Sequence, residues 1–157
     1  MISEENKDLL FKASIFSGLS TEQLSSVLEK AVEVSFLKGD VIMTEGEEGG
    51  ELFVVIEGKI QIEKHAGEDS TIKIAQSTKR GMMLGEMSLV DMKPRSATVR
   101  ADSDLKMVSI SRESLAGIFD KDPKVLATIS LNIARALSDR LRHSNDMLAD
   151  FIRNFTA

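Results

Sequence analysis

The first part of the hydrophobic pattern predicts a series of short β-strands. From Val32 onward apolar and polar residues alternate, which is typical of a strand with one buried face. Short apolar runs separated by glycine and charged residues continue to about residue 110. We expect strands over residues 32–36, 41–43, 52–56, 59–63, 71–75, 97–101 and 105–110. Many short strands with regular turns predict a β-sandwich or barrel.

Two of the connections read as hairpins. Glu57-Gly58 is a tight turn between the apolar run 52–56 and residues 59–63, so these two strands are expected to pair. Residues 65–70 are polar and read as the tip of a second hairpin.

The pattern is helical near both ends of the chain. Ser20 followed three positions later by Gln23 is a capping box, and it predicts a helix that begins there. A short helix is expected over residues 112–119. Asp122 can cap a last helix whose first position is Pro123, a place where proline is favoured.

The last helix is expected to run towards residue 151, with two apolar stripes. The stripe expected to pack on the strands carries Leu126, Ile129 and Ile133. A second seam alternates spacings of three and four, as heptads do, and carries Ala127, Ser130, Ala134, Leu137, Leu141, Ser144, Leu148, Phe151 and Phe155. Beyond Leu137 this seam is longer and more apolar than packing on its own domain requires. We therefore favour a parallel helix pair in a homodimer over a helix packed only on its own domain.

Composition narrows the class of protein. The chain has 157 residues, 42% of them hydrophobic, which is enough for one domain with a core. A net charge of -5 argues against a nucleic-acid-binding surface. The absence of cysteine excludes disulfides and thiolate metal sites. Residues 1–8 are polar and acidic rather than a secretory signal, and no apolar run could span a bilayer, so a cytoplasmic protein without membrane insertion is expected.

The candidate chemistry lies in residues 84–99. Gly85 has no Cβ, so a ligand can approach the backbone closely. Residues 86–90 can form one helical turn whose free N–H groups would face an anion. Pro94 stiffens the return of the chain and leaves Arg95 at the start of an apolar strand. A guanidinium buried there needs an anion, and its planar fork matches a phosphate.

This segment resembles the phosphate-binding cassette of the cyclic-nucleotide-binding domain family. That family includes catabolite-activator-type regulators, regulatory subunits of the cyclic-AMP-dependent kinase and cyclic-nucleotide-gated channels. Its pattern reads Phe-Gly-Glu-apolar-small-Leu, a short spacer, then Pro-Arg-small-Ala-Thr-Val, and here only Leu84 departs from it. The resemblance implies a mainly β fold, a double-stranded β-helix jelly roll with N-terminal helices over residues 1–122. Residues 123–157 would form the C-terminal lid and dimerisation helix of the same domain.

The resemblance also implies roles for the residues of the cassette. Arg95 would pair with the cyclic phosphate, and Glu86 would accept the ribose 2′-hydroxyl. The phosphate turn would be lined by Gly85, by the amides of Glu86, Met87 and Ser88, and by the hydroxyl of Ser96. Each residue also has a purely structural interpretation: Arg95 as a surface residue, Glu86 as a helix N-terminal acid and Ser96 as a small residue of the core.

Recognition of the base is less specified. Activator-type proteins use hydroxyl residues of the C-terminal helix, and here those positions fall near Arg140 and Leu141. Arg140 can stack on a purine or donate to guanine O6 and N7, or it can be a solvated residue paired with Asp139 or a glutamate. We expect cyclic AMP as the ligand, with cyclic GMP, read by Ser96 or Arg140, as the alternative.

Other functions are weighed against this one. An enzyme of the cupin kind would need clustered histidines, and the only two, His65 and His143, are far apart in the sequence, so neither a metal nor a catalytic site is expected. The glycines of residues 45–50 lack the Lys-Ser/Thr of a P-loop and read as turn formers. No helix-turn-helix follows the last helix, so direct DNA binding is not expected. A degenerate member that only dimerises or binds a partner stays open, as do the effector and a place within a larger regulator.

Overall fold

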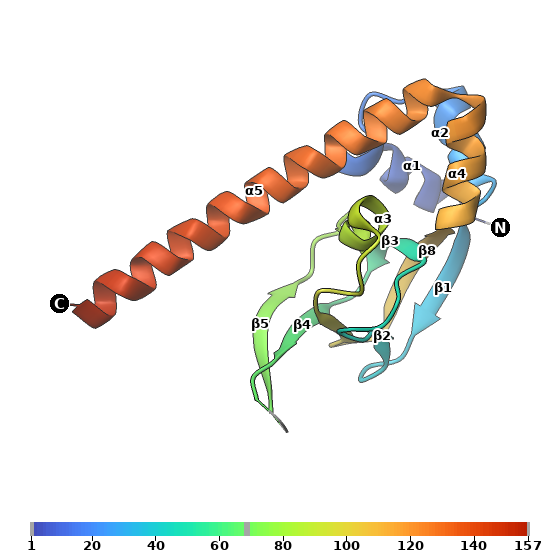
Figure 1. The fold of residues 1–157 in the computed structure, drawn as a ribbon. Coiled ribbons are helices and arrows are strands. Elements are labelled where there is room, and N and C mark those ends of the chain that lie inside the picture. The colour runs from blue at the N-terminus through green and yellow to red at the C-terminus, as the bar shows by residue number, and fades with distance from the viewer. Residues whose placement is uncertain (1, 68–69, 157) are drawn as a thin grey trace.

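Two antiparallel sheets form the body of the molecule (Figure 1). The structure is a computed structural model and describes residues 2–67 and 70–156. The strands are β1 (Val32–Phe36), β2 (Val41–Met43), β3 (Glu51–Glu57), β4 (Ile60–His65), β5 (Thr71–Ser77), β6 (Met83–Leu84), β7 (Thr98–Ala101) and β8 (Leu105–Ser111). One sheet has the order β1-β8-β3-β6 and the other β2-β7-β4-β5. The predicted two-sheet jelly roll is confirmed, and β6 is a strand that the sequence pattern missed.

One predicted hairpin is wrong. Strand β3 pairs with β8 and β6, whereas β4 pairs with β5 and β7, so the two strands lie in different sheets. At the turn between them Gly58 has φ +106°, and a Cβ there would lie 2.4 Å from the carbonyl oxygen of Asp104. The turn therefore carries the chain from one sheet to the other. The second predicted hairpin, β4 with β5, is confirmed, although residues 68 and 69 of its tip lie outside the described residues.

Strand β3 explains why its sequence is an unbroken apolar run. Leu52, Val54 and Ile56 belong to a core cluster shared with the helices. Phe53 and Val55 belong to a second cluster enclosed between the two sheets. The strand is buried on both faces, so apolar residues occupy successive positions rather than alternate ones.

The helices gather at one end of the two sheets (Figure 1). They are α1 (Glu4–Phe11), the 3₁₀ turn η1 (Ser14–Phe16), α2 (Thr21–Leu28), α3 (Glu86–Asp91), α4 (Arg112–Lys121) and α5 (Pro123–Thr156). The capping box of Ser20 and Gln23 at the start of α2 is confirmed. Asp122 accepts a hydrogen bond from the backbone N of Lys124 at 3.0 Å, as expected for the cap of α5.

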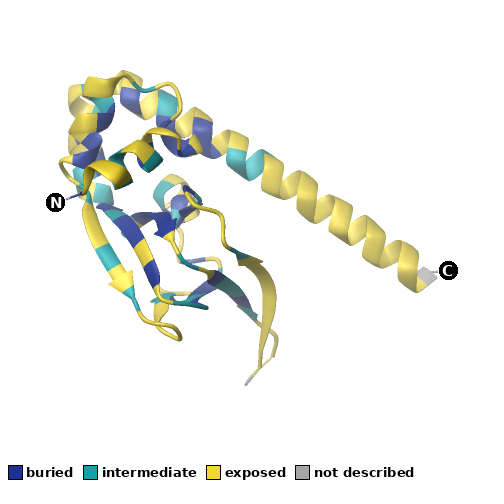
Figure 2. Cartoon of the chain, turned by 180° about the vertical axis from the view of Figure 1, so that it is seen from behind, coloured by how far each residue is buried: buried dark blue, intermediate teal, exposed yellow. Residues whose placement is uncertain are grey.

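Helix α5 packs on the body along its first half only (Figure 2). Val125, Ile129 and Ile133 are 1–3% exposed, at the spacing of one helix face. The prediction that Leu126 belongs to this face is wrong, because Leu126 is 42% exposed and Val125 takes its place. Side chains beyond Leu137 are largely exposed, and Leu141 and Phe155 keep 62% and 75% of their surface. None of the helices in the described ranges combines the length and the apolar character needed to cross a membrane.

Candidate functional site

The short helix α3 begins at a glycine that no other residue could replace without strain. Strand β6 ends at Leu84, and Gly85 then takes a left-handed conformation with φ +82° as the N-cap of α3. A Cβ on Gly85 would lie 2.4 Å from Nη1 of Arg95 and 2.6 Å from the carbonyl oxygen of Glu51. The predicted helical turn is confirmed, and the missing Cβ lets Arg95 pass directly beneath it.

Arg95 is buried, with 7% of its surface exposed. Its Nη1 donates to the carbonyl oxygen of Gly85 at 3.3 Å, and its Nη2 donates to the carbonyl oxygen of Glu51 at 3.1 Å and to Oε2 of Glu51 at 3.4 Å. Burial lowers the pKa of Arg95, and the Glu51 carboxylate offsets this only in part. A guanidinium held this way carries a charge that an incoming anion would compensate more fully.

A glycine-rich loop packs against the same arginine from the other side. Gly49 is buried, and a Cβ there would lie 2.7 Å from Cβ of Ser88 and 2.9 Å from Cζ of Arg95. The neighbouring backbone is fixed by two hydrogen bonds, from Gly46 N to the carbonyl oxygen of Arg95 at 2.9 Å and from Arg95 N to that of Glu47 at 2.8 Å. Gly49 is therefore more than a turn former, because it allows the loop to touch Arg95 and α3.

Glu86, the first residue of α3, is a buried carboxylate at 2% exposure. It forms an ion pair with Nη1 of Arg140, a residue 54 positions away on α5. Nη2 of Arg140 donates to the carbonyl oxygen of Met83 at 2.9 Å. Arg140 thus pairs with Glu86 rather than with the neighbouring Asp139, and it joins α5 to the start of α3.

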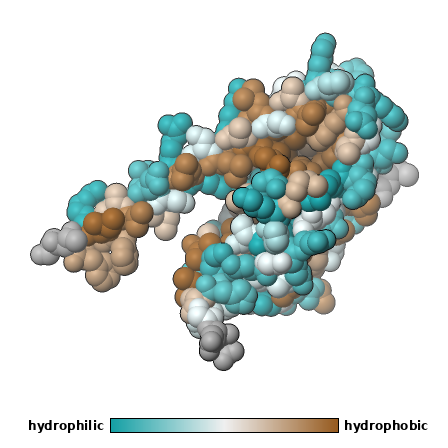
Figure 3. All heavy atoms as spheres, in the orientation of Figure 1, coloured by the Kyte–Doolittle hydropathy of each residue, from teal (hydrophilic) through white to brown (hydrophobic). Residues whose placement is uncertain are grey.

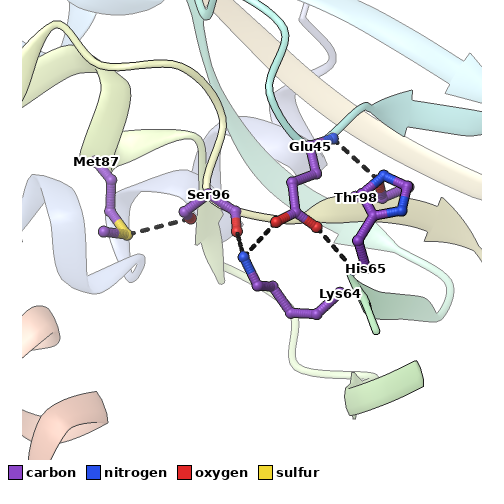
Figure 4. A network of polar contacts seen from close by, with 6 residues as sticks. All are labelled: Glu45, Lys64, His65, Met87, Ser96 and Thr98. Carbon is purple, nitrogen blue, oxygen red and sulfur yellow. Dashed lines mark hydrogen bonds and ion pairs between the residues drawn. The ribbon is translucent and has the colours of Figure 1, made fainter. Parts of the chain in front are cut away.

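A polar network holds the return strand of the cassette (Figure 4). Nζ of Lys64 donates to the carbonyl oxygen of Ser96 at 2.8 Å and forms an ion pair with Glu45. Glu45 also accepts a hydrogen bond from His65 N at 2.9 Å, and its own N donates to Oγ1 of Thr98 at 3.0 Å. The hydrogen bonds from Lys64 and His65 lower the pKa of Glu45. The network fixes the backbone of Ser96 and leaves its side chain exposed next to α3.

These elements enclose one pocket, which we call the cassette pocket. All seven residues singled out in the sequence line it, namely Gly85, Glu86, Met87, Ser88, Arg95, Ser96 and Arg140. Its remaining lining is apolar and comes from Met43, Ile62, Leu84, Ala97 and Val99. Polar groups therefore face an apolar wall, an arrangement suited to a ligand that is anionic at one end and flat and apolar at the other.

A second hollow, lined almost entirely by apolar groups, lies behind α3. This apolar groove, of about 420 Å³, runs between α3, α4 and α5 and includes Val90, Phe119, Leu126 and Leu137. In Figure 3 a hydrophobic band follows the inner part of α5. The groove shares no lining residue with the cassette pocket. We place the site in the cassette pocket because only there do the anion-binding groups converge.

A model of the cyclic nucleotide-binding domain matches residues 33–122, more than half of the chain. The chain belongs to this family. The CRP-like cAMP-activated global transcriptional regulator of Mycobacterium tuberculosis is 30% identical over 92% of this chain and 62% of its own length. Human cGMP-dependent protein kinase 2 is 26% identical over 94% of this chain and 20% of its own length. The chain therefore spans less than two thirds of these relatives.

A solved structure supports the fold. A cyclic nucleotide-binding domain from Methylobacillus flagellatus superimposes with a TM-score of 0.80 at 25% identity, over 92% of this chain and 80% of that one. Among the residues that the structure describes, no group of three His, Asp or Glu side chains is arranged to hold a metal ion.

Sequence reasoning missed several residues in and around the pocket of this cyclic nucleotide-binding domain. Glu51, which pairs with Arg95, lies at the start of β3, and only its place after the glycines distinguishes it. Most residues of the apolar wall were predicted to lie in strands. Which face of each strand points to the pocket depends on the pairing of β4 and β7, which the sequence does not specify. Gly49 was visible only as one of several loop glycines.

Proposed function

We propose that the chain is a cyclic nucleotide-binding regulatory module whose ligand is cyclic AMP. The observation that carries this proposal is the buried Arg95, which lies beside a helix start and a glycine turn in one pocket. Burial lowers the pKa of Arg95 by more than the Glu51 carboxylate raises it. Arg95 would bind the exocyclic oxygens of the cyclic phosphate. The amides of Glu86, Met87 and Ser88, freed by Gly85, would complete the anion site.

The ribose and the base would extend from the phosphate towards α5. Glu86 would accept the 2′-hydroxyl, because a buried carboxylate has acceptor capacity beyond its ion pair with Arg140. The purine would lie on the apolar wall of Ile62 and Val99, and Arg140, 42% exposed, would cover its edge or face. Ser96 would donate its hydroxyl to the phosphate or, with cyclic GMP, to the guanine edge.

The choice of cyclic AMP over cyclic GMP rests on similarity. The relative that is 30% identical is described as cAMP-activated, whereas the kinase at 26% identity is cGMP-dependent. Both nucleotides share the ring phosphate and the ribose, so the groups around Arg95 and Glu86 suit either. Arg140 and Ser96 are the two polar side chains left to distinguish the bases, and a guanine-specific role for them is the alternative.

We propose that ligand binding is transmitted through α5 to a parallel homodimer or to an effector protein. Between Leu141 and Phe155 the charged residues and the histidine are Arg142, His143, Asp146, Asp150 and Arg153, and all lie outside heptad positions a, d, e and g. The opposite stripe stays exposed, with Leu148 at 56% and Phe151 at 58%. In this scheme residues 1–122 bind the ligand and residues 123–157 form the lid and dimerisation helix. The module would act in the cytoplasm and without catalysis, and its net charge of -5 argues against a nucleic-acid-binding surface.

The deciding experiment is isothermal titration of cyclic AMP and cyclic GMP into protein that has been unfolded and refolded to remove carried ligand. We expect saturable binding, tighter for cyclic AMP, and a loss of at least about a hundredfold in affinity for Arg95→Ala, as for removal of one partner of a buried charge pair. Arg153→Ala is the matched control, since Arg153 is exposed on α5 and pairs with Asp150 far from the pocket.

The outcomes separate the alternatives. Equal affinity of Arg95→Ala and the unchanged protein would refute the phosphate assignment. Absence of heat with either nucleotide, from protein that is folded by circular dichroism, would favour a degenerate member that dimerises or binds a partner without nucleotide. Tighter binding of cyclic GMP would support a cyclic nucleotide-binding module whose ligand carries guanine rather than adenine.

A further inference from the structure

Arg112 is a half-buried cation that the proposed binding scheme does not use. It is the first residue of α4 and follows β8 directly. Its Nη2 donates to the carbonyl oxygen of Ser88 at 2.9 Å and also to that of Gly49. Its Nε is buried and finds no hydrogen-bond partner among the described residues. A side chain that leaves one donor unsatisfied in order to hold two carbonyl groups has a strongly constrained position.

The two carbonyl groups belong to two segments that meet beside Arg95. Ser88 lies in α3 and lines the cassette pocket, whereas Gly49 lies in the loop that leads to Glu51 and does not line it. The two segments meet at Arg95, because a Cβ on Gly49 would lie 2.7 Å from Cβ of Ser88 and 2.9 Å from Cζ of Arg95. The spacing between the α3 amides and the Arg95 guanidinium therefore depends on how Gly49 and Ser88 are held together.

Arg112 lies outside the cassette pocket. It lines the apolar groove behind α3 and is absent from the lining of the cassette pocket. Its charge is nevertheless close enough to Arg95 to contribute, after burial, to lowering the pKa of Arg95. A second cation behind the first favours an anion in front of both.

We propose that Arg112 is a positioning residue for the cyclic phosphate. By bonding both carbonyl groups, its guanidinium sets the distance between the α3 amides and Arg95, so that both reach the exocyclic oxygens of one phosphate. The inference rests on the proposed function, because it concerns the geometry of the same anion site. The backbone N of Arg112 donates to the carbonyl oxygen of Gly50 at 2.8 Å, a contact that any side chain at this position would keep.

The test compares Arg112→Gln and Arg112→Lys with the unchanged protein. The lysine variant keeps the charge but loses the planar fork that spans two carbonyl groups. Arg100→Gln is the matched control, because Arg100 also donates to a glycine carbonyl, that of Gly39 at 2.8 Å, from a half-buried position on β7. Each protein is titrated with cyclic AMP and with the two diastereomers of its cyclic phosphorothioate, in which sulfur replaces one or the other exocyclic oxygen.

We expect both Arg112 variants to lose about tenfold in affinity for cyclic AMP, the usual effect of losing hydrogen bonds to fixed groups. We also expect both to lose part of the discrimination between the two diastereomers, a ratio that reports the geometry of the site and that a change in fold stability would not alter. Arg100→Gln should stay within about twofold in affinity.

Each result bears on the proposal. If both Arg112 variants discriminate between the two diastereomers as well as the unchanged protein does, the positioning role is wrong. Full affinity in Arg112→Lys would also overturn it, because charge alone would then explain the effect of Arg112. Titrations are made well below the unfolding midpoint of each variant, with circular dichroism as the check of folding. Failure of the unchanged protein to bind any of the three nucleotides would instead refute the proposed function.

Discussion

The cassette pocket and the outer half of α5, residues 138–155, are built in opposite ways. In the pocket two charged groups are buried and paired: Arg95 and Glu86 are 7% and 2% exposed, and each has a partner within the chain. In the outer half of α5 apolar groups are exposed, with Phe155 at 75%. Burying polar groups is costly unless they are paired, and exposing an apolar stripe is unfavourable unless something covers it. The buried charges of the pocket are thus paired within one chain, whereas the apolar stripe on the outer half of α5 is left exposed, which is why we propose a second chain as its partner.

The largest effect is expected from breaking the pocket at Gly85. In Gly85→Ala the new Cβ would meet Arg95 and the carbonyl oxygen of Glu51, at a backbone angle that disfavours any side chain. We expect the free energy of unfolding to fall by about 2–4 kcal/mol and binding of cyclic AMP to be lost. Urea unfolding and titration measure the two effects. Gly117→Ala is the control: with open space around Gly117 in α4, it should stabilise by about 0.5–1 kcal/mol. Similar behaviour of the two variants would show that the pocket is not closely packed.

The next effect concerns assembly. Leu141→Asp with Leu148→Asp places two acids in the seam, and we expect the proposed dimer to dissociate at least about a hundredfold more readily, because two apolar contacts per chain are lost. Sedimentation equilibrium measures this. If ligand binding is transmitted to the dimer as proposed, affinity for cyclic AMP should change as well, because coupling between binding and assembly is reciprocal.

The control for the seam adds the same charge elsewhere. His143→Asp with Ala149→Asp places two acids on the outer face of the same helix, at exposed positions. We expect the assembly state to remain that of the unchanged protein. Dissociation by both pairs of substitutions would mean that net charge, rather than the seam, governs assembly.

The parts of the structure that depend on neighbouring residues were predictable from the sequence, whereas those that depend on distant residues were not. The helical turn after Gly85 and the burial of Arg95 were predicted correctly, because the glycine, the turn and the arginine interact within one segment. The predicted pairing of β3 with β4 is wrong. Glu57-Gly58 has the sequence of a hairpin turn, but Gly58 packs against Asp104, a residue far along the chain, and the two strands lie in different sheets. The partners of Arg140 and Arg112 could not be read, since each bonds residues tens of positions away that only the fold brings near.

A smaller effect is expected where the two regions meet, at Arg140. Arg140→Gln leaves the buried Glu86 without its cation, and we expect a loss of about 1–2 kcal/mol in the free energy of unfolding, less than for a fully buried pair because Arg140 is 42% exposed. Arg142→Gln is the matched control, since exposed Arg142 bonds only Ser138 by a side-chain contact at 3.3 Å, and it should change stability by less than about 0.5 kcal/mol. If the two variants have the same unfolding curve, the contacts of Arg140 do not stabilise the attachment of α5 to the pocket.

The smallest effect is a dependence on pH at the edge of the pocket. Hydrogen bonds from Lys64 and His65 hold the pKa of Glu45 in the folded protein below its usual range. A lowered folded pKa means that ionised Glu45 stabilises the fold above its ordinary pKa of about 4.3, and that this contribution is lost as the pH falls through the folded value. Glu45→Gln should therefore be less stable than the unchanged protein at pH 7, and the difference in urea midpoint should shrink towards pH 3. A difference that stays constant between these pH values would show that Glu45 does not act through its charge.

The uneven contact of α5 with the body has a mechanical consequence. Buried side chains anchor α5 up to Ile133, and from there to Phe155 the helix extends for about 33 Å at 1.5 Å per residue. A rotation of about 10° at the anchored end would therefore move the far end by roughly 6 Å, about the length of one helical turn. α5 would then amplify a small adjustment near Glu86. The resulting displacement at the far end of the helix would be large enough to change which surfaces meet there.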